Sequence, residues 1–374
     1  MKPFHSAARA PSICVGLICS ALLAGCSSTS TIPAGTGGAS GGGGASGGGG
    51  TGSTGGSSGA GGAAGGPPVT LVDAFKQPKV TQQITRLALS TGRVIFSSNK
   101  GKFIGSVLKT GGSAIPVQDM SGTPQGLAVI GAEVYGADSE GMKIVHGPFD
   151  QFNFKTFDVS PSGPYWVVTD GTELFFDDCV MKSVLKMAPK QVTPTEIGMA
   201  VPCPADMVVD EDFVWTTDYE GGGVYRLPKV PPSSGATVAA PWTAATMQTW
   251  GLALSSTHVY FATSNGTSPI TSKLYRSVKA SAAPQELSST VLINVTALAV
   301  DDNHLYFASA GTKEMEFADG SIGRLNLVSG KIETLATAQP RPLDIALDAS
   351  SVYWVNAGST GNGPLDTAVM KMGK

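Results

Sequence analysis

Histidine and cysteine are scarce in this sequence. Only four histidines and five cysteines occur in 374 residues, and two of the cysteines, Cys14 and Cys19, lie in one apolar run near the N-terminus. The histidines do not have the spacing of a zinc site. No Ser/His/Asp or Cys/His set and no Gly-x-Ser-x-Gly nucleophile motif can be assembled. The sequence therefore names no catalytic residue, and it favours binding over catalysis.

An excess of positive charge is missing as well. The formal net charge is -3, and charged residues make up 14% of the chain. No basic patch indicates a nucleic acid or an anionic lipid as a partner. The apolar run at residues 13–24 is about 12 residues long, which is too short to cross roughly 30 Å of hydrocarbon.

The N-terminus instead has the pattern of an export signal. Lys2 and Arg9 precede the apolar run, as in a secretory signal peptide. The run ends in Leu23-Ala24-Gly25-Cys26, which closely resembles the bacterial lipobox. This resemblance implies that residues 1–25 are removed, that Cys26 is lipidated, and that the protein is anchored in the cell envelope. Ser27 after the cysteine would suit the outer membrane. The alternative is an ordinary signal peptide with an incidental cysteine.

Residues 26–66 are almost entirely Gly, Ser, Thr and Ala. Such a segment cannot bury enough apolar surface to offset its ordering entropy, so we expect a disordered tether. A phosphate-binding loop is excluded, because no strand precedes the glycines and no Lys-Ser/Thr pair follows them. Pro67 and Pro68 end the tether, and residues 67–374 form the expected domain.

A hairpin pattern recurs along this domain. Residues 298–327 are a representative unit, with an apolar triplet, a polar turn and a second strand that carries Tyr306 and Phe307. Seven such triplets begin at Leu87, Leu127, Val167, Met207, Leu252, Leu298 and Ile345. Their spacing of about 40 to 47 residues is the length of a propeller blade.

The repeat predicts an all-β fold, a seven-bladed β-propeller with four-stranded blades. The last copy stops after its third strand, while an unassigned apolar segment at residues 69–75 precedes the first copy. We therefore expect residues 69–75 to pair beside residues 369–372 and close the ring, which removes exposed sheet edges.

Two blades carry a family resemblance. The sequences Phe213-Val214-Trp215-Thr216-Thr217-Asp218 and Ser351-Val352-Tyr353-Trp354-Val355-Asn356 are similar to the second strands of YWTD and NHL type propeller blades. These families include receptor modules, scaffolds, lyases and lactonases, so the resemblance implies a fold and leaves the chemistry open. Tyr135-Gly136-Ala137-Asp138 departs from the YWTD pattern, which leaves the subfamily open too.

Candidate binding residues gather at one end of the expected central channel. In a propeller, the loops from second to third strands and the loops leading into first strands emerge on the same face. On that face we expect two tryptophans, which could stack on a ring or sugar, and carboxylates, which could bind a cation or polar ligand. The candidates for ligand binding are Trp166, Trp250, Asp178, Asp206, Asp218 and Tyr219. The alternative is that the aspartates only bind nearby backbone donors.

Two further predictions concern the remaining cysteines and histidines. Cys179 and Cys203 would lie on this same face of neighbouring blades, and an exported protein meets oxidising conditions, so we expect them to form a disulfide. His258 and His304 would stand just before second strands, on the opposite face, which we expect to be poorly shaped for holding a ligand.

The sequence thus leaves two functional classes open. The first is a membrane-tethered envelope lipoprotein whose propeller binds a protein, glycan or small ligand. The alternative is a propeller enzyme, lyase or lactonase-like, although no histidine is expected at the mouth. A structural surface protein is the third interpretation. We expect a monomer with no nucleic acid partner and no organic cofactor, and the sequence leaves a bound divalent cation open.

Overall fold

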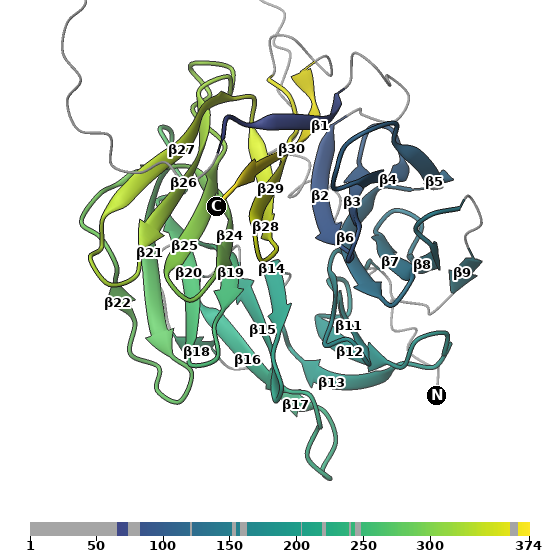
Figure 1. The fold of residues 1–374 in the computed structure, drawn as a ribbon. Helices are drawn as coiled ribbons and strands as arrows, with labels where there is room; N and C mark the ends of the chain where they lie inside the picture. The colour runs from purple at the N-terminus through teal and green to yellow at the C-terminus, as the bar shows by residue number, and fades with distance from the viewer. Residues whose placement is uncertain are drawn as a thin grey trace, which may run out of the picture. The chain divides into compact units, whose positions relative to one another are not determined.

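The computed structural model describes residues 66–73, 83–119, 122–151, 155–157, 163–202, 204–218, 222–238, 241–243, 248–359 and 366–374. These residues belong to one compact unit, Gly65–Lys374. They form seven antiparallel β-sheets arranged in a ring (Figure 1). The predicted all-β, seven-bladed propeller is therefore confirmed. In the part of the chain that the structure describes, no helix is long and apolar enough to span a membrane.

The first three blades follow the chain in order, each with its first strand innermost. Blade 1 holds β2 (Ile84–Leu89), β3 (Arg93–Ser98), β4 (Phe103–Leu108) and β5 (Ile115–Asp119). Blade 2 holds β6 (Pro124–Ile130), β7 (Glu133–Asp138), β8 (Lys143–Pro148) and β9 (Lys155–Phe157). Blade 3 holds β10 (Val167–Thr169), β11 (Leu174–Asp178), β12 (Ser183–Met187) and β13 (Thr195–Met199), with β17 (Thr237–Val238) added in parallel to β13.

The next three blades repeat this order. Blade 4 holds β14 (Pro204–Val209), β15 (Phe213–Asp218), β16 (Val224–Pro228) and β18 (Pro241–Thr243). Blade 5 holds β19 (Gln248–Leu254), β20 (His258–Ser264) and β21 (Thr271–Val278), with β22 (Gln285–Glu286) and β23 (Leu292–Ile293) both paired to β21. Blade 6 holds β24 (Val295–Val300), β25 (His304–Ser309), β26 (Gly320–Asn326) and β27 (Ile332–Gln339).

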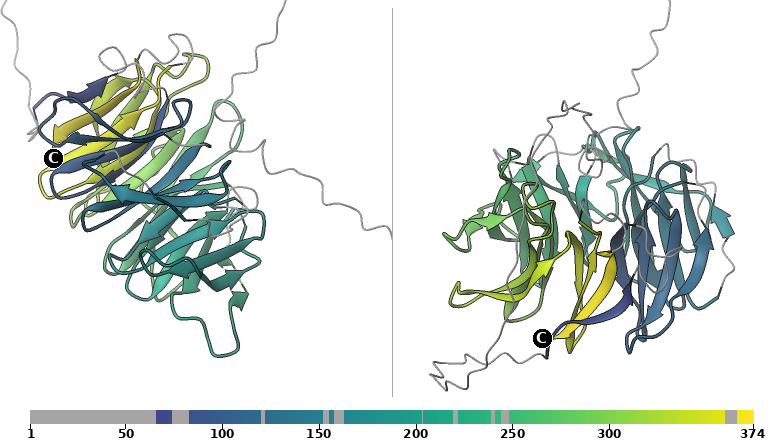
Figure 2. Two further views of the ribbon diagram at one scale, coloured as in Figure 1. Left: turned by 90° about the vertical axis from the view of Figure 1, so that its right-hand side faces the viewer. Right: turned by 90° about the horizontal axis from the view of Figure 1, so that it is seen from above.

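Blade 7 joins the two ends of the domain. Its strands β28 (Pro342–Leu347), β29 (Ser351–Asn356) and β30 (Ala368–Gly373) come from the C-terminus, and β1 (Val69–Asp73) supplies the fourth. Val69 lies opposite Lys371 in this pairing, and Asp73 lies opposite Ala368. Closure by the N-terminal strand is therefore confirmed for residues 69–73, while residues 74 and 75 of the predicted segment lie outside the described residues. The pairing of β1 with β30 is visible in Figures 1 and 2.

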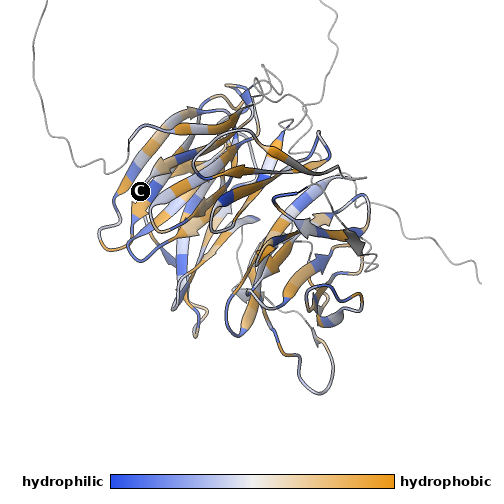
Figure 3. Cartoon of the chain, turned by 45° about the vertical axis from the view of Figure 1, so that its right-hand side comes forward, coloured by the Kyte–Doolittle hydropathy of each residue, from blue (hydrophilic) through white to orange (hydrophobic). Residues whose placement is uncertain are grey.

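The hydrophobic core is divided among the interfaces between blades. Seven buried clusters occur, and each one joins residues of two neighbouring blades. Large aromatic side chains of the second strands, such as Trp215 and Trp354, are fully buried in them. Figure 3 shows apolar residues on strands throughout the ring. Apolar residues at successive strand positions are thus explained by sheets that pack against a neighbour on both faces.

The two faces of the ring differ in their loops. We call the face with the loops between second and third strands the mouth face, and the face with the first-to-second hairpins the tip face. The loops that lead into first strands reach the mouth face, because the second-strand residue Asp177 accepts hydrogen bonds from the N–H groups of Tyr165 and Trp166 at 2.9 and 2.6 Å. β1 begins at Val69 near the tip-face end of β30, so the chain enters the propeller on the tip face.

Ion pairs link neighbouring blades on the tip face. In four blades, a hairpin aspartate accepts two backbone N–H bonds with Oδ1 and faces a lysine at the end of the next blade's third strand with Oδ2. The pairs are Asp170 with Lys229, Asp210 with Lys279, Asp301 with Lys374, and Asp348 with Lys109. At two other interfaces both equivalent positions are uncharged, Ser90 with Phe149 and Ser255 with Leu327. At these six interfaces, the aspartate and the lysine are therefore either both present or both absent.

Candidate functional site

Each first strand but one carries a β-bulge where it reaches the mouth face. The irregularities lie between Ile84 and Arg86, Pro124 and Leu127, Pro204 and Met207, Trp250 and Leu252, Val295 and Ala297, and Pro342 and Asp344. A bulge inserts a residue into one strand and re-aims its side chains. In β10 of blade 3 the pairing is regular. The bulges lie next to the residues that precede the apolar triplets, at the mouth-face ends of the innermost strands.

Arg86 is the centre of this arrangement. Its guanidinium carbon lies 4.4 Å from the centroid of the Trp166 ring, in a cation–π contact between blades 1 and 3. Arg86 Nη1 also donates to the carbonyl oxygens of Thr85 at 3.3 Å and Leu343 at 3.5 Å. A single side chain therefore contacts blades on several sides of the channel.

Two aspartates flank Arg86 and share one pattern of hydrogen bonds. Asp206 Oδ1 accepts from the N–H of Met207 at 2.7 Å, and its Oδ2 accepts from the N–H of Leu252 in the next blade at 2.6 Å. Asp206 in this way ties the first strand of blade 4 to that of blade 5.

Asp344 repeats the pattern between blades 7 and 1. Its Oδ1 accepts from the N–H of Ile345 at 2.9 Å, and its Oδ2 accepts from the N–H of Leu87 at 2.9 Å. The two aspartates hold equivalent positions in the repeat, just before their triplets. The same local sequence thus produces the same link at two interfaces.

Burial and charge act in opposite directions on these carboxyl groups. Burial raises the pKa of Asp206 to about 7, and the positive charge of Arg86 partly opposes that rise. Burial likewise raises the pKa of Asp344, again opposed by Arg86. The negative charge of Asp344 also raises the pKa of Asp206. Arg86 is therefore the cation that stabilises both carboxylates when they are ionised.

The two tryptophans predicted at the mouth lie in the strands or loops that reach it. Trp166 is partly exposed, and its Nε1 donates to the carbonyl oxygen of Pro204 at 3.2 Å. Gly126 lies against its backbone, because a Cβ there would approach Trp166 Cα to 2.8 Å and Val167 N to 2.7 Å. Trp250 is also partly exposed, and it lies at the bulge of β19.

The other predicted carboxylates lie away from Arg86. Asp178 is buried at the end of β11, and its Oδ1 accepts from the N–H groups of Val180 and Met181 at 3.1 and 3.0 Å. Asp218 is buried at the end of β15, where its charge adds to burial in raising the pKa of Tyr225. Asp178 thus binds nearby backbone donors, as the alternative interpretation expects.

The structure therefore brings two of the six candidate residues together. Trp166 and Asp206 lie around Arg86, whereas Asp178 and Asp218 close the ends of second strands. Tyr219 lies outside the described residues, as does Cys203, so the disulfide from the buried Cys179 stays a prediction. Arg86 and Asp344 belong to the site although sequence reasoning did not choose them. Their position before a triplet, shared with Asp206, was the signal that could have identified them.

The histidines lie elsewhere. His258 and His304 are the first residues of β20 and β25 on the tip face, as their sequence positions predicted. His146 is buried in β8, where its Nδ1 lies 3.2 Å from Glu133 Oε2 and its ring stacks on Tyr135. Within the described ranges, no group of three or more His, Cys, Asp or Glu side chains could hold a metal ion.

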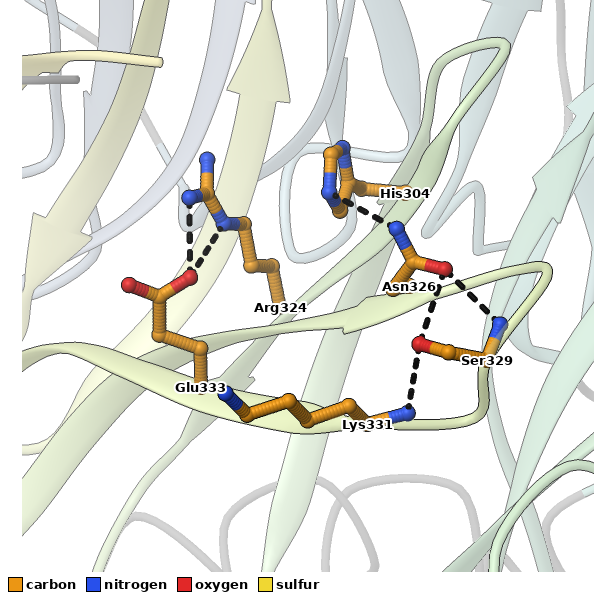
Figure 4. A pocket seen from close by; sticks show the side chains of 6 residues that line it. All are labelled: His304, Arg324, Asn326, Ser329, Lys331 and Glu333. Atoms are coloured by element: carbon orange, nitrogen blue, oxygen red, sulfur yellow. Dashed lines mark hydrogen bonds and ion pairs between the residues drawn. The ribbon is translucent and has the colours of Figure 1, made fainter. Parts of the chain in front are cut away.

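A cavity of about 140 Å³ opens on the tip face of blade 6. Six polar side chains line it (Figure 4): His304, Arg324, Asn326, Ser329, Lys331 and Glu333. The expectation that this face is poorly shaped for a ligand stays untested, although the face does carry this hollow. The hairpin turn before His304 is short, but the neighbouring strands β26 and β27 and their turn carry long side chains that line a hollow beside it.

Sequence comparison identifies no family, since no protein-family model matches the chain and no curated protein matches it significantly. Solved structures do resemble it. One is a streptogramin B lyase at 16% identity and a TM-score of 0.61, covering 78% of this chain and 93% of that chain. Another is a catalytically inactive virginiamycin B lyase from Staphylococcus aureus with quinupristin, a variant in which histidine is replaced by alanine, at 14% identity and a TM-score of 0.59, covering 82% and 98%.

A third similar structure is YCF48 bound to D1 peptide, at 11% identity and a TM-score of 0.59, covering 82% of this chain and 95% of that chain. At such low identities these likenesses show the propeller fold alone. They include both enzymes and a peptide-binding protein, so the fold by itself does not decide between catalysis and binding.

Proposed function

We propose that this chain is a lipid-anchored protein of the bacterial cell envelope whose propeller binds a peptide segment of a partner protein at the channel mouth. Sequence reasoning left protein, glycan and small ligands open, and the chemistry of the mouth favours the first. The anchor is Cys26, in the lipobox-like Leu23-Ala24-Gly25-Cys26, which suits the outer membrane.

The contact between Arg86 and Trp166 carries the proposal. A partly exposed tryptophan, a guanidinium and the carboxyl groups of Asp206 and Asp344 converge from four blades. Tryptophan and arginine are the residues that most often dominate protein–protein binding energy. A peptide can place apolar side chains on Trp166 and Trp250 while its backbone bonds to polar groups at the rim. The structure of YCF48 with its peptide supports the use of a propeller in this way.

The lyase-like structures support a second candidate, a lyase or lactonase-like enzyme. One of those lyases is inactive when a histidine is replaced by alanine. The three histidines among the described residues, His146, His258 and His304, all lie away from the mouth. This placement is the reason that we favour binding over catalysis.

The binding proposal is tested with arrays of peptides and of glycans. The full mature chain with Cys26→Ala is the probe, and Trp166→Ala should weaken its binding to selected peptides about tenfold or more, since hot-spot residues contribute over roughly 1.4 kcal/mol. His258→Ala on the tip face is the control and should leave binding unchanged. Selection of glycans alone, or equal losses in the two variants, would contradict a peptide site at the mouth.

The anchor and the enzyme alternative have separate tests. After a high-salt wash that removes electrostatic binding, Cys26→Ala should move the protein from the membrane fraction to the soluble fraction, and unchanged partitioning would disprove lipidation. For the alternative, incubation with quinupristin followed by chromatography should leave the compound intact. Its consumption by wild-type protein, abolished in Trp166→Ala, would favour a lyase.

A further inference from the structure

We propose that the tip-face cavity of blade 6 binds a phosphate group, and that the phosphate belongs to the headgroup of an anionic phospholipid. The cavity is formed where β25, β26 and β27 meet at the tip face. It lies on the opposite face from the peptide site proposed above, and it does not depend on that site.

The lining of the cavity is rich in hydrogen-bond donors. Arg324 Nε and Nη2 donate to Glu333 Oε2 at 3.0 and 2.8 Å, which holds the guanidinium in one orientation (Figure 4). The only carboxylate in the lining is thereby paired. Arginine, lysine and histidine beside an amide and a hydroxyl are the groups that proteins use for phosphate.

Asn326 is oriented by its own turn. Its Oδ1 accepts from the N–H groups of Val328 and Ser329 at 3.1 and 2.8 Å, and from Ser329 Oγ at 3.0 Å. The Nδ2 group is left on the side of His304, with its nitrogen 3.5 Å from Nε2. The amide therefore presents its donor end toward the cavity.

Lys331 supplies the charge that is not already used. Its side chain is exposed, and within the described part of the chain its ammonium has no ion-pair partner. Lys374, from blade 7, is not part of the lining; its Nζ lies 3.1 Å from Asp301 Oδ2, and Asp301 Oδ1 lies 3.9 Å from Nδ1 of the lining residue His304. Basic groups on separate strands produce this site, which is why the sequence shows no basic run.

Two observations favour a membrane as the source of the phosphate. Val328, at the tip of the β26–β27 turn beside the cavity, is 95% exposed. An apolar side chain next to cationic groups is the composition of a surface that lies in the membrane interface. Second, the chain enters the propeller at Val69 on this same face, in the blade next to the cavity. A lipid anchor joined through the preceding residues connects to the propeller on the side that holds the cavity.

The test is sedimentation of the full mature chain with Cys26→Ala, so that no lipid anchor contributes. Vesicles of phosphatidylcholine containing about 30% phosphatidylglycerol should bind it, and vesicles of phosphatidylcholine alone should bind it less. Lys331→Gln should weaken binding about fivefold, the factor expected for one lysine at an anionic surface. Val328→Ser should also weaken it. Lys182→Gln, an exposed lysine on the mouth face, is the matched control and should have no effect.

Competition with inorganic phosphate distinguishes the two possible sources of the phosphate group, a lipid headgroup and a free phosphate ion. If it competes with the vesicles and Lys331→Gln reduces the competition, the phosphate site and its lipid source are both supported. If phosphate binds in titration calorimetry in a Lys331-dependent way but vesicles do not bind, the headgroup is overturned and a free phosphate is the ligand. Equal effects of Lys331→Gln and Lys182→Gln, or no binding of either probe, would overturn the site. None of these results depends on Trp166 or on lipidation, so they are separable from the proposed function.

Discussion

At the scale of residues, Arg86 connects three blades: it lies in blade 1 and contacts Trp166 of blade 3 and the carbonyl oxygen of Leu343 of blade 7. Asp206 and Asp344 are partly exposed residues whose carboxyl groups interact electrostatically with Arg86, and only their ionised forms attract the guanidinium. Removing Arg86 takes away the positive charge that opposes the rise in pKa of both carboxyl groups. The importance of Arg86 should therefore depend on whether these groups are ionised.

We expect Arg86→Gln to destabilise the protein more at about pH 8 than at about pH 5. A carboxyl group with a raised folded-state pKa keeps its proton in the folded state over a window where the unfolded state has lost it. Stability therefore falls as pH rises from about 4 toward the folded pKa of Asp206, about 7. Without Arg86 the folded pKa values rise further and the fall extends to higher pH. Urea unfolding at both pH values measures this, with Arg276→Gln as control, and a pH-independent cost would contradict it.

Gly126 leaves no room for a larger side chain at the mouth face. A Cβ at this position would meet backbone atoms of Trp166 and Val167 at under 3 Å, and backbone cannot rotate away. Gly126→Ala should destabilise by about 1 to 3 kcal/mol, as overpacking does, and should shift tryptophan fluorescence. Gly92→Ala, where nothing lies within 4 Å of the added carbon, should be close to neutral. Equal stability of the two variants would show that the mouth has more room than its geometry indicates.

At the scale of elements, the sequence predicted the repeat but not the contacts between repeats. The apolar triplets, second strands and third strands were placed correctly because each blade repeats the same local sequence pattern. The aspartate–lysine pairs of the tip face join neighbouring blades, and the two residues of each pair are about 60 or more positions apart in the sequence. Only the closed ring brings Asp210 beside Lys279, and a single sequence gives no signal of that pairing.

These pairs should contribute measurable stability. A double-mutant cycle of Asp210→Asn and Lys279→Met should give a coupling energy of about 1 to 3 kcal/mol, the range for partly buried contacting charges. Asn keeps the oxygen that accepts the hairpin N–H bonds, so the cycle isolates the pair. Ser255→Ala at the uncharged interface, combined with Lys279→Met, should show no coupling. Additive effects of Asp210→Asn and Lys279→Met would contradict the role of the pair.

The same pairs predict a loss of stability in acid. Hydrogen bonds and lysine partners, acting against burial, hold the pKa values of Asp170, Asp210, Asp301 and Asp348 below their ordinary range. For a lowered pKa, the stabilisation is present above the unfolded value of about 4 and is lost as pH falls below it. Unfolding by urea should therefore become easier below about pH 4, and less so in Asp210→Asn. An unchanged acid limb in that variant would count against the assignment.

The predicted disulfide belongs to this scale too, since it would join blade 3 to the loop leading into blade 4. If Cys179 and Cys203 are bonded, closing about 24 residues should stabilise the protein by roughly 3 kcal/mol. Thiol titration of unfolded, unreduced protein should then find neither cysteine reactive. Two reactive thiols would disprove the bond.

For the whole molecule, the sequence predicted the number of blades and the means of closure, but only part of the group of residues around Arg86. Trp166 and Asp206 were chosen from their places before triplets, and both lie at the mouth. Asp178 and Asp218 were chosen because acidic residues gather after second strands, and the structure shows both buried at strand ends. Aspartates in these two places have similar local sequences. Their positions in the assembled ring distinguish them, because Asp206 lies near Arg86 whereas Asp178 and Asp218 end second strands.

Ring closure gives the last prediction. Leu71 and Val72 of β1 are only 5% and 4% exposed, and they pack in the cluster that joins blade 7 to blade 1. Replacing both with alanine should cost about 3 to 6 kcal/mol, the sum expected for two buried aliphatic side chains. The weakened β1 would expose the edge of β30, so dimers or larger species should appear in size-exclusion chromatography.

Deletion of residues 27–64 is the matched control for this variant, because it removes chain without touching β1. That deletion should leave the urea midpoint unchanged and the protein monomeric. If the alanine variant keeps wild-type stability while the control loses it, closure would depend on the segment before β1 and not on the strand itself. Since loss of β1 would free the edge of β30 and remove buried residues from the interface between blades 7 and 1, we expect the opposite: one short strand, five residues in length, determines whether seven blades form one cooperative unit.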